Sequence, residues 1–395
     1  MNDCKILDVT SFSTELRLLL DVISLNSKTT KNSINIQYYK ELNWDHFIEL
    51  VIHHRVYPTI YKTIKNSGED IIPQYVVRKL ANLFQKNTFK MLHLSAEMYQ
   101  LNDLFTQDEI RTIFLKGPVL AREVYGDISL RTCGDLDILI PIKELEKADN
   151  ILTNQGFIKD DYILTVLNDW KWRHHHVTYF HHEKGIKVEI HWKLNPGLVK
   201  EPSFNDIWER KRKSSAANYP LYCLGEEDLF LFLVSHGARH GWSRLRWLLD
   251  IHQLTAKELN WGYTIQLLKK YQCCHIAGQA LILSNQLFNT KIPNELKPLV
   301  SIKRSKYLAI QAIYYISKMI NLHSDNLSID DAKFHKRHLY DVMTFRQKLL
   351  FIMSFLYPYP EDAVTLPLPK GLHFLYFPLR PLLWAWRKTR KQALT

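Results

Sequence analysis

The sequence predicts an α+β fold in which a core of strands and helices lies between two largely helical regions. Three patterns indicate this organisation. Helical periodicity covers residues 1–105, short apolar strands alternate with helices over residues 106–215, and helical periodicity returns over residues 216–395. We therefore expect an N-terminal helical region, an α+β core, and a C-terminal helical region with a basic tail.

In the N-terminal region, apolar periodicity predicts three helices. Asn43 is a typical N-cap, and Pro58 lies just beyond the expected end of the second helix. We expect His53, His54 and Arg55 to form the polar shoulder of a packed helix, with ligand contact as the less favoured alternative. The predicted helices cover residues 16–25, residues 44–56, and a long segment through Leu80 to Leu104.

The predicted core begins with the apolar stretch 112–115, which ends at a turn suited to phosphate. Gly117 permits a tight turn, and Pro118 suits the first position of a helix that reaches about Tyr125. Free backbone N–H groups and the positive end of that helix would lie beside the Lys116 ammonium, which suits a polyphosphate. We expect Lys116 to lie away from the carboxylates that follow.

Two carboxylates, Asp135 and Asp137, come directly before or within a second apolar strand. Ile138–Ile140 is typical of a buried strand, which Pro141 ends. Side chains two apart on a strand share a face, so these carboxylates repel each other unless a cation lies between them. Mg²⁺ prefers such oxygen ligands. The alternative is an Asp that caps a loop before a strand.

A third carboxylate lies on a later strand with clean alternation. Over residues 186–192, Val188 and Ile190 would face the core, which leaves Glu189 and His191 on the opposite face. A Lys-Gly turn, an Asp-x-Asp strand and a later carboxylate form an ordered set that favours a catalytic metal site over the loop-capping alternative.

Residues 174–182 are rich in histidine and predict a hairpin with residues 186–192. A zinc site requires ligands that converge. Adjacent histidines on a strand point to opposite faces, so we expect most of these side chains not to converge. We favour anion contact or a surface strand, with His191 beside Glu189 as the best functional candidate.

In the C-terminal region, two histidines share one face of a helix that begins with acidic residues. His236 and His240 are four residues apart, with Arg239 and Arg244 nearby. No Glu follows the first histidine, which excludes the zinc-protease motif. Contact with nucleotide phosphates or an acceptor, and a structural hydrogen-bonding role, both stay open for these four side chains.

The chain ends in an apolar, Trp-bearing and finally basic segment, residues 349–391. Such a segment suits a membrane interface or packing on the helical region. Because Pro378 and Pro381 break a regular helix, we favour packing over membrane contact.

The composition is that of a globular protein that attracts anions. The chain is 46% hydrophobic, and its net charge of +12 suits nucleotides, RNA or an acidic membrane surface. No Rossmann or P-loop pattern occurs, and no uncharged apolar run is long enough for a membrane span. Five cysteines without metal-ligand spacing, and no signal peptide after Met1, predict reduced thiols in the cytoplasm.

In these motifs the chain resembles the uncharacterised nucleotidyltransferases of the polymerase-beta-like superfamily. The likeness spans roughly residues 40–255. One feature departs from the superfamily: the usual Gly-Ser or Gly-Gly turn close before the aspartates is replaced by Lys-Gly with a longer gap. The motifs that match are Leu115-Lys116-Gly117, Tyr125, Arg131, Gly134-Asp135-Leu136-Asp137 and Val188-Glu189-Ile190-His191-Trp192.

The resemblance implies a polymerase-beta-like core, a small mixed sheet with helices. The implied reaction moves a nucleoside monophosphate from an NTP such as ATP to an acceptor and releases pyrophosphate, with Mg²⁺ or alternatively Mn²⁺ as cofactor. Asp135, Asp137 and Glu189 would be the catalytic residues and the metal ligands. Nucleotide contacts would come from Lys116, Gly117, Arg131, Gly134 and His191.

The sequence leaves the acceptor open among small molecules, glycans, peptides, proteins and RNA, and we expect no DNA partner. Two rival hypotheses belong to other classes. The first is a catalytically silent nucleotide-binding or scaffold protein, and the second is an RNA-binding protein that relies on its charge. The second lacks an aromatic RNP-like strand or a Lys/Arg stripe.

Overall fold

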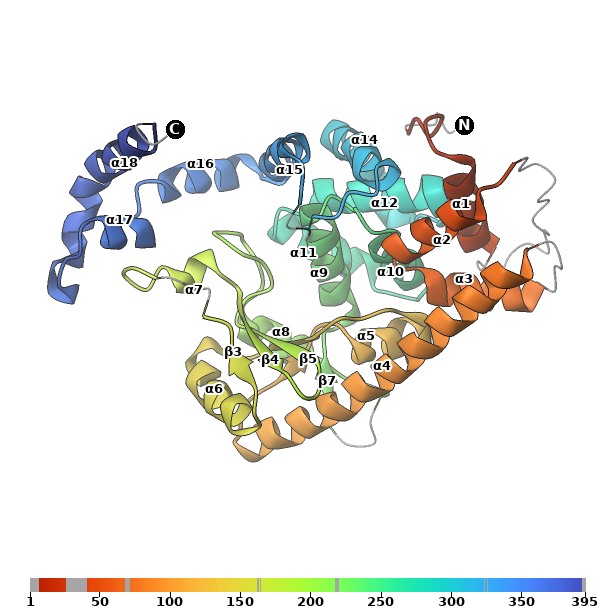
Figure 1. Ribbon diagram of the computed structural model, residues 1–395, viewed down its shortest axis with the longest axis horizontal. Helices are drawn as coiled ribbons and strands as arrows, with labels where there is room; N and C mark the ends of the chain where they lie inside the picture. The colour runs from red at the N-terminus through yellow and green to blue at the C-terminus, as the bar shows by residue number, and fades with distance from the viewer. Residues whose placement is uncertain are drawn as a thin grey trace.

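A computed structural model of the chain describes residues 7–25, 41–67, 72–161, 163, 165–216, 220–322, 324 and 326–392. Helices dominate the molecule, and a mixed sheet occupies one part of it (Figure 1). In that view the long helix α4 (Gln74–Gln107) runs along the lower edge, past the sheet, while helices from both ends of the chain lie above it. The predicted α+β class is confirmed.

The first helices agree with the sequence prediction, with one addition. The Asn43 side chain caps α2 by accepting a hydrogen bond from the backbone N–H of His46, at 3.0 Å. Pro58 lies beyond the end of α2, as predicted, but it does not lie in a loop. It lies in the first turn of a further helix, α3, where its missing N–H has no cost. These helices are α1 (Thr14–Leu25), α2 (Trp44–His53) and α3 (Tyr57–Ser67).

Among the described residues, seven strands form one sheet in the order β3-β4-β5-β2-β1-β7-β6. Neighbouring strands are antiparallel except for the pairs β2–β5 and β1–β7, which are parallel. The β4–β5 hairpin confirms the prediction for the histidine-rich segment. The strands are β1 (Ile113–Phe114), β2 (Leu136–Leu139), β3 (Ile158–Lys159), β4 (His176–His181), β5 (Ile186–His191), β6 (Arg212–Lys213) and β7 (Tyr222–Cys223).

Short helices connect these strands. The helix predicted after Pro118 is present, but it continues as a π-helical turn over Ala121–Tyr125. The α-helices are α5 (Pro118–Leu120), α6 (Leu145–Asn154), α7 (Trp170–Arg173) and α8 (Phe204–Arg210). Turns of 3-10 helix occupy Ile128–Leu130, Ile142–Glu144, Asn294–Leu296 and Lys370–Leu375.

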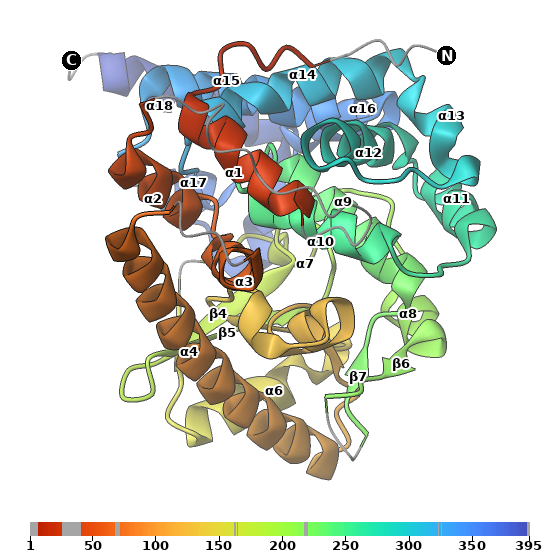
Figure 2. The same ribbon diagram turned by 90° about the vertical axis from the view of Figure 1, so that its right-hand side faces the viewer.

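The C-terminal region is helical, as predicted. Figure 2 shows its helices stacked above the sheet, beside α1. They are α9 (Glu226–Arg239), α10 (Leu245–Thr255), α11 (Trp261–Lys270), α12 (Cys274–Phe288), α13 (Lys297–Val300), α14 (Lys303–Ser317) and α15 (Ile329–Val342). Within the residues described, no helix combines the length and apolar character that crossing a bilayer requires.

The last helices form an arm that extends from α15 beyond the rest of the molecule (Figure 1). Pro381 lies inside a continuous helix, so the expected break is wrong; Arg380 and Arg387 both pair with Asp362 and hold that helix on its neighbour. The expected packing of the segment is also wrong for much of its apolar surface, since Leu356 is 67% exposed. The arm comprises α16 (Phe345–Ser354), α17 (Pro360–Thr365) and α18 (Tyr376–Gln392).

Two hydrophobic cores hold the rest together. The first joins α1–α3 to α9–α14, so the predicted N-terminal and C-terminal helical regions share one apolar interior. The second lies between the sheet, α6 and the later half of α4, from Met91 to Phe105. The sheet extends to Cys223 in β7, past residue 215. The three regions with boundaries at 105 and 215 stay a prediction.

Candidate active site

Parallel pairing of β2 and β5 brings two of the predicted carboxylates side by side. In this register Asp137 lies directly opposite Glu189, and Leu139 opposite His191. The Asp137 side chain is fully buried and that of Glu189 is nearly so. Carboxylates in such a position require compensating positive charge. The prediction that the later strand lies beside the aspartates is therefore confirmed.

Lys116 supplies part of that charge. Its Nζ lies 3.0 Å from Asp137 Oδ1, so the expectation that Lys116 lies away from the carboxylates is wrong. The turn explains the difference: Gly117 has φ of +81°, and a Cβ placed there would lie 3.5 Å from the carbonyl oxygen of Asp135. The Lys-Gly turn thus packs directly on the aspartate loop, with the lysine beside the strand.

Lys187 supplies a second ammonium group, which sequence reasoning missed. Its Nζ lies 2.6 Å from Glu189 Oε1 and 3.6 Å from Asp135 Oδ2. Lys187 therefore bridges two carboxylates that belong to different strands or loops. The alternation that placed Glu189 and His191 on one face also places Lys187 there, two residues before Glu189. That signal was present in the sequence.

His191 completes the charged cluster. Its Nε2–H lies 3.2 Å from Asp137 Oδ1 and 3.4 Å from Glu189 Oε2. Burial alone would lower the pKa of His191, but the hydrogen bonds to these two carboxylates raise it. Burial likewise opposes ionisation of Glu189, yet the hydrogen bond from His191 and nearby cations hold the pKa of Glu189 well below its usual range.

The two aspartates differ in their electrostatic surroundings. Burial raises the pKa of Asp135, and the Asp137 carboxylate raises it further. Burial acts on Asp137 in the same direction, but the Lys116 ammonium and the hydrogen bond from His191 outweigh it and lower the pKa of Asp137. Asp137 is thus kept ionised in the centre of the cluster, while Asp135 lies at its partly exposed edge.

A divalent cation fits this donor set. Ligand atoms of Asp137, Glu189 and His191 lie within 4.8 Å of one another. Asp137 Oδ2 is buried and has no hydrogen-bond partner among the described residues, so it is available to a ligand. Oxygen donors of this kind suit Mg²⁺ or Mn²⁺. Asp135 is not part of the compact set; it approaches Glu189 through Lys187.

Two of the five histidines of residues 174–182 converge. Ligand atoms of His175, His176 and His191 lie within 4.8 Å of one another, whereas His174, His181 and His182 belong to no such group among the described residues. The expectation that most of these side chains do not converge therefore agrees with the structure, but the adjacent pair His175 and His176 is not kept apart as alternation predicts. The alternation rule fails because His175 lies in a bend before β4 begins, while His176 faces His191 directly across the hairpin. This nitrogen-rich set is a second candidate metal site that shares His191 with the first.

Arg131, a predicted nucleotide contact, is paired within the protein, which favours a structural role. It is 2% exposed, and its Nε and Nη2 donate to the two carboxylate oxygens of Asp250 at 2.8 and 2.9 Å. The Tyr125 hydroxyl donates to the same carboxylate at 2.7 Å. This pair ties the loop before the aspartates to α10 and leaves no free edge of the guanidinium for a phosphate.

The predicted contact residues of the C-terminal region divide into two groups. Arg244 is held by the carbonyl oxygen of His53 and by Asn321 Oδ1, which favours the structural role. The rings of His236 and His240 lie 4.6 Å apart on α9, beside the site. Arg239 reaches the hairpin, with Nη1 3.4 Å from His175 Nε2.

Gly134, a predicted nucleotide contact, precedes Asp135, and apart from its chain neighbours no atom of the described residues lies within 4 Å of a Cβ placed on this glycine.

A mixed sheet that holds buried carboxylates on adjacent parallel strands beside lysines suits an enzyme that handles phosphates with a divalent cation. Residues 40–289 match the family model described as "Uncharacterised nucleotidyltransferase". Since the match covers more than half of the sequence, the chain belongs to this family. Searches of curated proteins and of solved structures gave no match. Family membership supports nucleotidyl transfer as the general activity, and hence a nucleotide substrate.

Proposed function

We propose that the protein is a Mg²⁺-dependent nucleotidyltransferase with a polymerase-beta-like core. It transfers a nucleoside monophosphate from an NTP such as ATP to a hydroxyl or phosphate of an unidentified acceptor and releases pyrophosphate. The observation that supports this most strongly is the register of β2 and β5, which places Asp137 beside Glu189 with the buried Asp137 Oδ2 lacking a partner. Family membership points to the same reaction.

Asp135, Asp137 and Glu189 would hold the cation in this proposal, and Asp135 would join the other two once Lys187, which pairs with both Asp135 and Glu189, leaves them. When bound, Mg²⁺, or Mn²⁺ in its place, would neutralise phosphate charge and favour an in-line displacement at phosphorus. His191 holds both Asp137 and Glu189 through one ring nitrogen, so it fixes the relative position of two ligands. Lys187 and Lys116 form ion pairs with Glu189 and Asp137 in the structure. Their ammonium groups would form ion pairs with phosphate oxygens when an NTP binds.

The chemistry itself requires positioning and charge stabilisation. The acceptor oxygen forms a bond to the α-phosphorus of the NTP. The bond from that phosphorus to the oxygen that bridges the α- and β-phosphates breaks, and pyrophosphate leaves with the electron pair. A hydroxyl acceptor gives up its proton to solvent, whereas an ionised phosphate acceptor has none to lose. Lys116 and Lys187 stabilise the negative charge that spreads over the phosphate oxygens.

One observation favours a rival, a catalytically silent nucleotide-binding protein. Lys116 and Lys187 already neutralise the carboxylates at 3.0 and 2.6 Å, so the site is stable without a metal. The two hypotheses differ in turnover. Against the rival, the three carboxylates predicted as metal ligands are all present, and the buried Asp137 Oδ2 has no hydrogen-bond partner within the part of the chain that the structure describes.

The test uses α-labelled NTPs, Mg²⁺ and fractionated cell extract. We expect one class of fraction to take up label with the wild-type protein and not with Asp137→Asn, because loss of a metal ligand removes several kcal/mol of transition-state stabilisation. Glu189→Gln should lose most turnover and still bind NTP. Asp103→Asn and Glu146→Gln make the same chemical changes at exposed side chains and are the matched controls. Label uptake by Asp137→Asn within a few-fold of wild type contradicts the proposal.

A further inference from the structure

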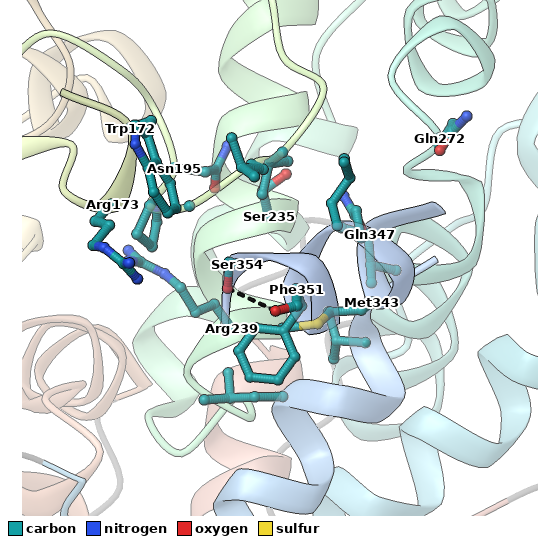
Figure 3. Close-up of a pocket in the computed structure, with 18 of the residues that line it drawn as sticks. Trp172, Arg173, Asn195, Ser235, Arg239, Gln272, Met343, Gln347, Phe351 and Ser354 are labelled. Atoms are coloured by element: carbon teal, nitrogen blue, oxygen red, sulfur yellow. Dashed lines mark hydrogen bonds between the residues drawn. The ribbon is translucent and has the colours of Figure 1, made fainter. Parts of the chain in front are cut away.

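A large cavity is connected to the carboxylate cluster through Arg239, His175 and His191, and none of its lining residues takes part in the proposed metal or triphosphate contacts. Its volume is about 690 Å³, within the range of ligand sites in proteins. Figure 3 shows it between Trp172, Arg173 and Asn195 on one side and Met343, Gln347 and Phe351 on the other. The first side is built by the segments that flank the β4–β5 hairpin, and the second by α15 and α16.

The walls of this cavity are mostly apolar. Side chains such as Leu198, Ile276, Leu339, Val342 and Leu350 line it. Burying an apolar body there removes apolar surface from water, which favours binding in proportion to the area covered. The wall from α15 and α16 lies beyond residues 40–289, the segment that matches the nucleotidyltransferase family. Part of the apolar wall is therefore built by residues outside the matched segment.

One charged group reaches this apolar space without a carboxylate partner. Arg239 comes from α9 and lines the cavity. Its Nε is buried without a hydrogen-bond partner, and its one contact in the described chain is Nη1 with His175 Nε2. Burial lowers the pKa of Arg239 to about 10, so the guanidinium stays charged at neutral pH. Glu189, Glu201 and Asp137 act on Arg239 at longer range, but none of them is within ion-pair distance in the described chain, so an anionic ligand group would give the guanidinium a direct partner.

Arg239 also connects the cavity to the proposed chemistry. Its partner His175 has its ring centre 5.3 Å from that of His191, which in turn contacts Asp137 and Glu189. Two histidine rings therefore lie between Arg239 and the carboxylates. A molecule anchored on Arg239 that is long enough to span these two rings would reach the place where phosphate is transferred.

We propose that this cavity is the acceptor site and that the acceptor is an anionic amphiphile, with an aliphatic or aromatic body in the apolar walls and a carboxylate or phosphate group on Arg239. This rests on the proposed function, because only a nucleotidyltransferase has an acceptor. A hydroxyl oxygen of the amphiphile, separate from the anionic group on Arg239, forms the bond to the α-phosphorus, pyrophosphate leaves with the electron pair of the broken bond, and the hydroxyl proton passes to solvent. The product is a nucleotidyl ester of the amphiphile.

The nucleotide is a poorer occupant of the same space. A triphosphate carries several negative charges, whereas the unpaired cation at the cavity wall is Arg239; Arg173 is already paired with Asp169 at 2.6 Å. The lysines that suit a triphosphate, Lys116 and Lys187, lie on the other side of His191, among the carboxylates. Apolar walls contribute nothing to the binding of phosphates.

Binding of decanoate, measured by calorimetry against neutral decanol, tests the site without any turnover. We expect wild type to prefer decanoate by about tenfold or more, the contribution of one charge-assisted contact. Arg239→Met should remove that preference and keep decanol binding. Leu350→Trp, which fills the cavity, should weaken both ligands by about tenfold or more. Leu349→Trp and Arg337→Met alter exposed side chains outside the cavity and are the matched controls.

Equal affinity of wild type for decanoate and decanol overturns the inference. So does a preference that survives Arg239→Met, or displacement of decanoate by α,β-methylene-ATP, which would assign the cavity to the nucleotide. In the label-transfer reaction, decanoate should compete with the acceptor fraction and not with NTP. Label transfer without decanoate binding contradicts this inference alone, whereas decanoate binding without any label transfer contradicts the proposed function.

Discussion

Arg131→Met tests whether this arginine is a structural partner of Asp250 or a contact of the nucleotide. The side chains of Arg131 and Asp250 are 1% and 0% exposed, and two hydrogen bonds join them. Replacement of Arg131 leaves the Asp250 carboxylate buried with only the Tyr125 hydroxyl as a short contact. Met keeps the length and the apolar part of the side chain and removes the charge.

The magnitude follows from burial and from the bidentate geometry. Removal of one partner of a buried ion pair costs about 3–5 kcal/mol of unfolding free energy, because the other charge stays buried. Asp250→Asn should cost about as much, since it leaves the guanidinium uncompensated. If the two changes were independent, their losses of unfolding free energy would add. The double variant, however, has neither of the two buried charges of this pair. We expect it to lose only about 1–3 kcal/mol, the cost of an imperfectly paired polar group.

Urea unfolding, followed by circular dichroism, measures these free energies in a double-mutant cycle. NTP binding is measured by calorimetry under conditions in which each variant is folded. A structural role predicts a large coupling energy between Arg131 and Asp250 and an NTP affinity that changes little. Loss of NTP affinity in Arg131→Met with unfolding free energy near that of wild type would refute the structural assignment and restore the nucleotide contact.

Two further changes probe the site. In the absence of nucleotide, Lys187→Met should raise the affinity for Mn²⁺ several-fold, because the change removes an ammonium that competes for Glu189 and Asp135. The same change should lower NTP affinity. Both affinities are measured by calorimetric titration, and weaker Mn²⁺ binding than in wild type would contradict this reasoning. Gly117→Ala should cost about 1–3 kcal/mol of unfolding free energy, because φ of +81° with ψ of −144° is strained for any side chain, whereas Gly126→Ala at a left-handed position without neighbours should cost less.

Local sequence pattern correctly predicted strands and a helix cap that are determined by neighbouring residues. The alternation over residues 186–192 and the apolar stretch at Ile138–Ile140 became neighbouring strands, and the Asn43 cap was found where expected. Helix α3 was missed because Pro58 signals both the end of one helix and the first turn of another. Helix α18 continues through Pro381, and the pairing of its Arg380 and Arg387 with Asp362 of α17 is a tertiary contact that no local pattern contains.

The site was predictable where strand geometry alone places side chains. Asp137 and Glu189 came together as alternation and the family resemblance implied. The pairing of Arg131 could not be predicted from local pattern, because its partner, Asp250, is 119 residues away and only tertiary packing brings the two together. The position of Lys116 depends on the direction of a glycine turn. The histidine cluster depends on a bend at His175 that interrupts alternation.

A mixture of the protein, Mg²⁺, NTP and fractionated cell extract, run once with α-labelled and once with γ-labelled NTP, distinguishes nucleotidyl transfer from other uses of an NTP. With α-labelled NTP and Mg²⁺, the wild-type protein should move label into an acceptor fraction, and Asp137→Asn should not. With γ-labelled NTP, label should appear only in pyrophosphate. Appearance of the γ-label in the acceptor would mean phosphoryl transfer, and retention of both labels in intact NTP in every fraction would contradict catalysis by this site.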